Sequence, residues 1–445
     1  MRRPVADFDA PTGHNRPSIH AAGRLRLGLA KLLGGLGTPL PDAEVETLWA
    51  RTEGWAAGLR LACLSLQDHP NPSGFVAAFS GTARAMADYL IGEVLDRQPA
   101  EMREFLLRTS VAEWLTGGLA DALTGGHDGL DRLRELERAN TFVLALDPNQ
   151  VTYRYHQLFA ELLRAELRHQ YPGEVAELHR RAARWYAADG LAVEAVRHAV
   201  AALDWEHARD LLVERWATLV ATPTILWDLL AQFPAGLVRR SPELALLAAL
   251  NRASLGDLEA VEAYRRLAEA NATAVPEDRR GWFDAILVQV RATQARSLGE
   301  LDALRAGAQE LLELAPAADT HPEWLINATD LRTVALGNLG VVALWSGDFQ
   351  AATRHLEQGL AAAASRPLLP AEEYPRLNCL SHLALVEVAG GRLRRAAARG
   401  QEAVALAERR GWSQAMQAFA GHLALAWATH HQGDLGAAAQ HLERA

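Results

Sequence analysis

Few residues in this sequence are arranged for covalent chemistry. A phosphate-binding P-loop has the pattern G-x-x-x-x-G-K-[ST], because its backbone N–H groups and its lysine together hold the phosphates. No such pattern occurs, and Lys31, the only lysine, lies in an unrelated leucine- and alanine-rich segment. The patterns H-E-x-x-H, C-x-x-C and G-x-S-x-G are absent as well. The sequence therefore predicts no catalytic residue.

Neighbouring histidines near the C-terminal end of the sequence suggest metal ligation at first sight. His430 and His431 are adjacent, and His422 lies a short way before them. Adjacent side chains on a helix point in different directions, which does not suit the compact ligand set that a metal ion needs. We therefore predict no metal site.

A set of polar and aromatic residues in the second half of the sequence could instead bind a small molecule. Tryptophan rings stack on sugars and other flat ligands, while amide and guanidinium groups supply hydrogen bonds. The candidates are Gln289, Thr293, Arg296, Trp345, Asn378, Trp427 and His430. The competing interpretation, which we favour for the two tryptophans, places them in the hydrophobic core between helices.

These candidates are positioned by a repeat with a period of 42 to 48 residues. A glycine, a polar residue and then leucine or phenylalanine recur at Gly256, Gly299, Gly347, Gly391 and Gly433. Small residues upstream of each glycine let two helices approach closely, and the glycine allows a tight turn. Each helical hairpin leaves one face uncovered, so the hairpins must stack. The pattern predicts an α-solenoid similar to tetratricopeptide (TPR) repeats, with the candidates on inward positions of the first helices.

The middle of the sequence contains the only strand-like runs. The elements predicted for this region follow the order helix, helix, β-hairpin and closing helix, which is the order of a winged-helix domain. The predicted elements are helices at 119–123, 130–139 and 156–169, and strands at 141–146 and 151–155. The second predicted helix carries arginines that interleave with acidic residues. This balance favours a solvated surface over one that reads DNA.

The composition is that of an ordinary globular protein of several domains. The 445 residues are 49% apolar and 22% charged, with a net charge of −9. These values exclude wholesale disorder and argue against a surface built for nucleic acid. Two distant cysteines exclude a disulfide framework, and no apolar run reaches the length of a membrane span. We expect a cytoplasmic, mainly α protein with a winged-helix domain, a helical arm and a TPR-like α-solenoid.

Six short segments, in this order, resemble the large LuxR-type transcription regulators of the MalT-like kind, which belong to the signal-transducing NTPases called STAND proteins. The resemblance is close over roughly residues 40–220 and only architectural over the repeats. The segments are Thr52–Ala62 (TEGWAAGLRLA), Phe75–Gly81 (FVAAFSG), Phe105–Val111 (FLLRTSV), Leu136–Asn140 (LERAN), Tyr153–Phe159 (YRYHQLF) and Leu178–Ala183 (LHRRAA).

The resemblance implies a switch. In that family, bound ADP holds a closed state, and ATP with an inducer in the repeat domain opens the protein so that it self-associates and binds promoters. A winged-helix histidine in related proteins contacts the β-phosphate of ADP, and His156 occupies a comparable place. The alternative is a histidine that only bonds the local backbone at the start of a helix.

The sequence departs from the family plan, since it contains neither a P-loop nor a C-terminal helix-turn-helix. We therefore expect no ATP or ADP as a cofactor of this chain, and the chain resembles a regulator truncated at both ends. The predicted parts are a lead-in (1–38), a helical remnant of the lid of the nucleotide-binding module (39–98), the winged-helix domain (99–170), a helical arm (171–240) and a repeat sensor of about five hairpins, the last incomplete (241–445).

The most favoured function is inducer sensing and protein–protein interaction in signal-dependent transcription control, without enzymatic activity or direct DNA binding. The expected partners are a small-molecule inducer or a protein in the repeat groove, and a second copy or a paralogue. One alternative is a stand-alone repeat scaffold that binds a protein. Another is a fragment of an ATP-hydrolysing switch whose ATPase part is encoded upstream.

Overall fold

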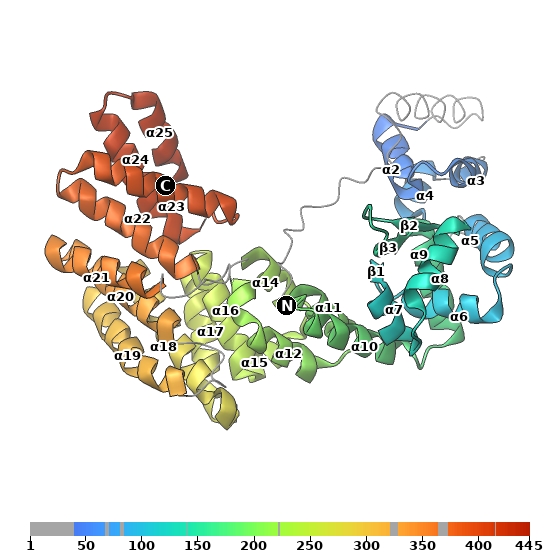
Figure 1. Cartoon of the computed structure of the whole chain (residues 1–445), viewed down its shortest axis with the longest axis horizontal. Helices are drawn as coiled ribbons and strands as arrows, with labels where there is room; N and C mark the ends of the chain where they lie inside the picture. Colours follow the sequence, from blue (N-terminus) through green and yellow to red (C-terminus); the bar gives the residue numbers. More distant parts are fainter. Residues whose placement is uncertain are drawn as a thin grey trace. The chain divides into compact units, whose positions relative to one another are not determined.

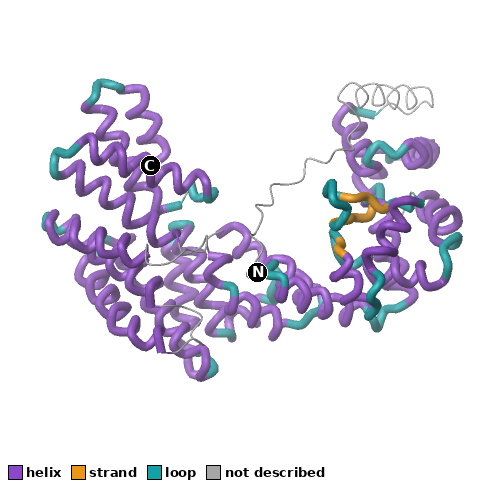
Figure 2. Tube along the Cα trace, viewed as in Figure 1, coloured by secondary structure: helices purple, strands orange, loops and turns teal. Residues whose placement is uncertain are grey.

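The computed structural model describes residues 40–66, 71–80, 84–139, 141–220, 223–320, 328–363, 373–413 and 415–445 (Figures 1 and 2). The predicted lead-in and Lys31 lie outside these ranges. The chain forms two compact units. We call the first the winged-helix unit; it comprises the described residues up to Gly190, with Ala201–Leu203. We call the second the repeat unit; it comprises Leu191–Val200 and Asp204–Ala445.

The winged-helix unit is mostly helical, and its helices are short. Left-handed backbone at Glu53 and Gly54 separates α2 from α3, and the Thr116 side chain caps α7 by accepting from the Leu119 N–H. The helices are α2 (Asp42–Thr52), α3 (Ala56–Leu66), α4 (Pro72–Ala78), α5 (Arg84–Leu90), α6 (Ala100–Thr109), α7 (Gly117–Thr124), α8 (Gly129–Arg138), α9 (Gln157–Gln170) and α10 (Val175–Ala188).

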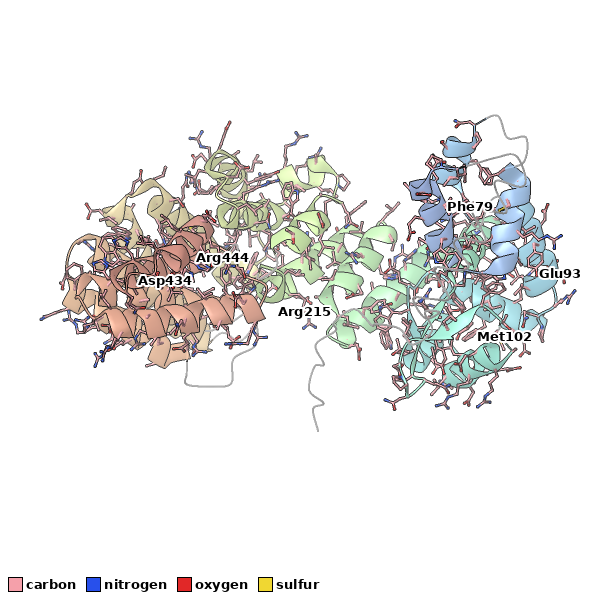
Figure 3. The ribbon with its side chains drawn as sticks, turned by 90° about the horizontal axis from the view of Figure 1, so that it is seen from above. Phe79, Glu93, Met102, Arg215, Asp434 and Arg444 are labelled. Carbon is pink, nitrogen blue, oxygen red and sulfur yellow. The ribbon has the colours of Figure 1, made fainter. Side chains whose placement is uncertain are left out.

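The sequence pattern over 75–95 does not form one continuous helix. The helix α4 ends at Ala78, where Phe79 takes up extended backbone, and α5 passes directly into a π-helical segment, η1 (Ile91–Leu95). Figure 3 labels Phe79 and Glu93 in this region, and Met102 on the following helix. The Arg51 side chain donates to the carbonyl oxygens of Ala77 and Phe79, which stabilises the break. The amphipathic periodicity of this stretch does not record such local contacts.

The predicted hairpin is confirmed and forms part of a three-stranded antiparallel sheet. Strand β2 (Val143–Ala145) pairs with β3 (Thr152–Tyr155), with Val143 opposite Tyr155. A third strand of two residues, β1 (Leu115–Thr116), pairs with the other edge of β3 and was not predicted. Figure 2 shows these as the only strands in the described part of the chain. The buried Tyr155 hydroxyl lies 2.6 Å from Thr109 Oγ1 of α6, which ties the sheet to the helices.

The repeat unit begins with a run of short helices, which we call the arm helices, and continues with five helical hairpins. The helical run over 206–220 is interrupted at Arg215. The arm helices are α11 (Ala192–Ala201), α12 (Trp205–Glu214), α13 (Trp216–Val220), α14 (Pro223–Leu230) and α15 (Ala235–Arg240). The hairpins are α16 (Pro242–Ser254) with α17 (Leu258–Ala270), α18 (Glu277–Leu298) with α19 (Leu301–Thr320), α20 (Ala328–Trp345) with α21 (Phe349–Ala363), α22 (Glu373–Ala389) with α23 (Leu393–Arg409), and α24 (Met416–His431) with α25 (Leu435–Arg444). A 3₁₀ turn, η2 (Ala272–Ala274), follows α17.

All five repeat glycines have left-handed backbone, with φ between 74° and 83°. This conformation is costly for any residue with a Cβ atom, which explains why glycine recurs at the turn. In the last hairpin, Asp434 follows its glycine and caps α25 by accepting from the Ala437 N–H at 2.9 Å; Figure 3 labels Asp434 and, at the end of α25, Arg444. The predicted turn chemistry is confirmed.

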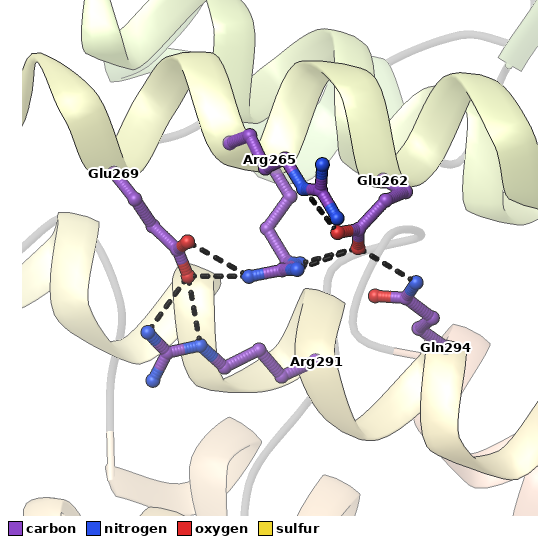
Figure 4. Close-up of polar contacts among 6 residues, drawn as sticks. Glu262, Arg265, Glu269, Arg291 and Gln294 are labelled. Atoms are coloured by element: carbon purple, nitrogen blue, oxygen red, sulfur yellow. Dashed lines mark hydrogen bonds and ion pairs between the residues drawn. The ribbon is translucent and has the colours of Figure 1, made fainter.

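Consecutive hairpins are also joined by polar contacts. Between α17 and α18, Arg291 donates to Glu269 at 2.7 Å and Gln294 donates to Glu262 at 3.0 Å (Figure 4). Arg265 lies between the two glutamates and bonds both. These contacts link the first two hairpins at several points, of which the Gln294–Glu262 bond does not involve Arg291. No helix in the described part of the chain is long and apolar enough to cross a membrane.

Candidate ligand cavity and the His156 contact

His156 immediately precedes α9 and contacts the turn between α2 and α3. Its Nε2 lies 3.0 Å from the carbonyl oxygen of Thr52, and its backbone N–H donates to the carbonyl oxygen of Phe142 at 2.8 Å. The residue is 7% exposed and packs edge-on against Trp55 and Phe142. His156 therefore holds the α2–α3 turn against the winged helix.

A bidentate ion pair lies beside this histidine. Arg154 Nη1 donates to Glu53 Oε1 at 2.8 Å, and Nη2 donates to Oε2 at 2.6 Å. Glu53 Oε1 also accepts from the backbone N–H of Gln157, at 3.1 Å. Burial would raise the pKa of Glu53, but Arg154 and His156 outweigh it, and the pKa is lowered. Glu53 is thus ionised and connects the α2–α3 turn to the start of α9.

The protonation state of His156 limits what its ring can bind. Burial lowers the pKa of His156, against the opposing effect of Glu53. The neutral ring carries its proton on Nε2, since that atom donates to the Thr52 carbonyl, and Nδ1 is then an acceptor. Nδ1 has no hydrogen-bond partner in the described part of the chain. A bare acceptor repels phosphate oxygens, so the nucleotide-sensing role of His156, which stays a prediction, would require a second proton.

The repeat unit contains a cavity of about 140 Å³. The first helices of all five hairpins, α16, α18, α20, α22 and α24, contribute to its wall, together with α13. Most of the wall is apolar. The aliphatic and methionine side chains include Leu250, Ile286, Leu331, Val334 and Met416. This is the inner side of the hairpins, where the repeat pattern placed the ligand candidates.

Four of the predicted residues line this cavity together: Gln289, Thr293 and Arg296 from α18, and Asn378 from α22. Thr293 Oγ1 donates to the Gln289 carbonyl oxygen at 2.9 Å and lies 3.5 Å from Gln289 Nε2. The Oε1 atom of Gln289 is buried without a hydrogen-bond partner in the described part of the chain. Gln289 therefore offers the cavity a hydrogen-bond acceptor that no described residue satisfies.

Arg296 is held by two neutral acceptors. Its Nη1 donates to Asn378 Oδ1 at 2.9 Å, and its Nη2 to His382 Nε2 at 3.1 Å. His382 Nδ1 in turn donates to the Asn378 carbonyl oxygen at 2.8 Å, which leaves Nε2 free to accept. Burial and the charge of Arg296 lower the pKa of His382 to about 3, so its ring is neutral. Burial lowers the pKa of Arg296 to about 10, so it remains charged at neutral pH.

The other predicted residues lie elsewhere. Trp345 and Trp427 are 60% and 53% exposed, so the prediction that they belong to the core is wrong. Both come near the C-terminal end of a first helix, where the turn leaves little to pack against. Trp427 stacks on His431 at 5.6 Å between ring centroids. Trp345, Trp427 and His430 do not line the cavity.

The structure adds cavity residues that sequence reasoning missed. Asn338, Tyr374 and Gln417 line the cavity, and His382 accepts a hydrogen bond from Arg296 without lining the cavity itself. Gln417 Oε1 is another buried acceptor without a partner among the described residues. Asn338 and His382 lie on the first helices of their hairpins, as the identified candidates do. Their positions on the inward-facing side of the helical repeat could have identified them. Gln417 lies in the first turn of α24, directly after a loop, where the repeat pattern does not indicate which side chains face inward.

Within the described ranges, no cluster of three or more histidine, cysteine, aspartate or glutamate side chains could hold a metal ion. His422 and His441 are paired across α24 and α25, with 3.3 Å between their Nδ1 atoms. His430 and His431 contact each other at 5.5 Å between centroids and point in different directions, as helix geometry requires.

The described part of the chain combines a winged-helix unit with a set of arm-like helices and a stack of TPR-like hairpins that lines a cavity. Residues 91–175 match the family model described as the MalT winged helix domain.

Two known proteins are similar to the chain over part of their length. The chain is 36% identical over 277 residues to the serine/threonine-protein kinase PknK of Mycobacterium tuberculosis, covering 61% of this chain and 24% of that protein. It is 35% identical over 289 residues to the HTH-type transcriptional regulator MalT of Yersinia enterocolitica, covering 63% of this chain and 32% of the regulator. The chain thus spans about a quarter to a third of the length of these relatives.

A solved structure with the same architecture is the STAND protein with a tetratricopeptide repeat sensor from Pyrococcus horikoshii. The match has a TM-score of 0.53 at 14% identity and covers 94% of this chain and 59% of that one. At this identity the likeness concerns the fold alone. It confirms the mainly α architecture of a winged-helix domain and a helical solenoid.

Proposed function

We propose that this chain is the sensing and interaction part of a signal-dependent transcription regulator. A small molecule binds in the cavity of the repeat unit, and binding changes how the chain associates with itself or with another protein. The observation that carries the proposal is the convergence of Gln289, Thr293, Arg296 and Asn378 on one cavity at the inner side of the hairpins. Such concave, mostly apolar cavities with a few converging polar groups are the usual form of a small-molecule site.

Related regulators act on DNA, but we assign neither promoter binding nor catalysis to this chain. The sequence has no P-loop pattern to hold phosphates, and the kinase relative is matched over only 24% of its length. The proposal is therefore a non-enzymatic sensor that works in the cytoplasm without a nucleotide of its own.

Binding of a protein partner is the second candidate. Trp345 and Trp427 are exposed, and Phe349 at 42% and Leu435 at 64% are exposed close to the same turns. Exposed large apolar residues that gather near turns, here those of the third and fifth hairpins, are typical of a protein-binding surface. This surface and the cavity use different residues, so substitutions separate the two functions.

Equilibrium dialysis of the full chain against a bacterial small-molecule extract, read by mass spectrometry, tests the proposal. We expect the wild-type chain to retain at least one compound, Thr293→Val with Gln289→Leu to lose it, and Trp345→Ser with Trp427→Ser to keep it. Retention that depends on the tryptophans instead would place the binding function on the exposed surface. No retained compound would contradict small-molecule sensing.

A further inference from the structure

We propose that the ligand of the repeat cavity is a compact organic acid whose carboxylate binds Arg296. This inference rests on the proposed sensing function and adds the chemical class of the ligand. The guanidinium of Arg296 lines the cavity while its only hydrogen-bond partners, Asn378 and His382, are neutral.

Arg296 is half-buried, and a guanidinium that loses part of its hydration without a counter-ion is costly, because a charge taken out of water is normally paired. No carboxylate lies within ion-pair distance of Arg296 in the described part of the chain. Asp330 also lines the cavity but makes no ion pair with Arg296. Two of the five N–H groups of Arg296 are used, which leaves three donors in a planar fork. That fork matches the two oxygens of a carboxylate.

The remaining wall indicates the rest of the ligand. Leu250, Ile286 and Val334 offer an apolar surface, which suits a hydrocarbon or aromatic body rather than a free inorganic anion. The buried Oε1 atoms of Gln289 and Gln417 require hydrogen-bond donors, which a hydroxyl or amine on the ligand would supply. The cavity volume of about 140 Å³ suits a body about the size of an aromatic ring.

Matched carboxylate and carboxamide probes test the inference. We would measure the binding of benzoate against benzamide, 4-hydroxybenzoate against 4-hydroxybenzamide, and inorganic phosphate to the full chain by calorimetry and ligand-observed NMR. We expect each carboxylate to bind about tenfold or more tightly than its amide, and the hydroxylated acid to bind more tightly than benzoate. Phosphate should bind weakly, because it gains nothing from the apolar wall.

Three variants keep the test specific. Arg296→Gln should remove the preference for carboxylates. Asn378→Asp keeps the guanidinium and places a carboxylate where Oδ1 lies 2.9 Å from Nη1, so it should remove the preference while preserving the fold. Arg291→Gln, on the same helix but exposed and paired with Glu269 (Figure 4), changes the net charge equally and should leave the preference intact.

Several results would overturn the inference. These are equal or tighter binding of the amides, binding of phosphate in preference to every organic acid, an equal loss in Arg291→Gln and Arg296→Gln, or no binding of any acid in the series. Tight binding of neutral compounds in the dialysis experiment would refute the organic-acid inference alone. The proposed sensing function would then stand, because that experiment does not depend on charge.

Discussion

At the residue scale, burial and the charge of Arg296 set the protonation state of His382, which accepts a hydrogen bond from Arg296. Arg296 stays charged because its pKa of about 10 lies well above neutral pH, and His382 stays neutral because burial and the charge of Arg296 oppose its protonation. Protonation of His382 at Nε2 would remove one acceptor and add a like charge next to Arg296. The cavity is therefore built around one permanent cation.

This coupling predicts a pH dependence of stability. The pKa of His382 is about 3 in the folded chain against an ordinary value of 6.5, so the unfolded state binds a proton that the folded state does not. Stability should fall as the pH drops from 6.5 towards 3, by up to about 1.4 kcal/mol per pH unit from this group. Urea unfolding at several pH values should give a shallower dependence for His382→Gln than for the wild type. Identical slopes would show that His382 is not held neutral.

The pair of Glu53 and Arg154 predicts a local stability effect in the winged-helix unit. Both side chains are partly screened by solvent, at 22% and 34% exposed, so we expect a coupling energy of only about 1–2 kcal/mol in a double-mutant cycle with Glu53→Gln and Arg154→Met. The exposed pair of Glu93 and Arg97, at 49% and 66%, is the matched control and should give near zero. Equal coupling for the two pairs would contradict the structural role of Glu53.

At the element scale, the repeat hairpins depend on close helix approach at positions without side chains. A Cβ atom added at Gly340 of α20 would lie 2.5 Å from Cγ of Leu356 on α21, which is fully buried. We expect Gly340→Ala to destabilise the chain by about 1–3 kcal/mol through overpacking. Gly236 of α15 has open space around the same atom and should be neutral or slightly stabilised as alanine. Urea midpoints of the two variants measure this difference, and a tolerated Gly340→Ala would refute close packing there.

Much of this element scale could be predicted from the sequence. Gly256 and its four equivalents mark positive φ, and Asp147 to Gln150 mark a turn, because both signals are local and chemical. The break after Ala78 and the strand at Leu115 could not be predicted, since they depend on the Arg51 side chain and on pairing with Tyr153. Local periodicity contains no record of such contacts.

The candidate site was predictable in part for the same reason. Repeat position on the first helices correctly predicted that Gln289, Thr293 and Arg296 face inward; they lie within two turns on one face of α18. The same reasoning misplaced Trp345, because the position of a residue in the repeat indicates which way its side chain faces but not whether neighbouring helices cover it. The missing counter-ion of Arg296 is a three-dimensional fact, and no sequence pattern reports it.

At the scale of the whole molecule, two units with separate tasks are expected. The winged-helix unit carries the MalT-type match over residues 91–175, and the repeat unit carries the cavity. If the repeat unit is the sensor, a ligand should first order the helices that line its cavity. Effects on self-association or on a partner would follow from that event.

Hydrogen–deuterium exchange of the full chain, with and without a bacterial small-molecule extract, tests whether the repeat unit is the sensor. We expect the extract to slow exchange in peptides from α18, α20 and α22 of the wild type, and to cause no such change in Arg296→Gln. Unchanged exchange in these helices, or protection confined to the winged-helix unit or to the turns beside Trp345 and Trp427, would contradict the sensor role.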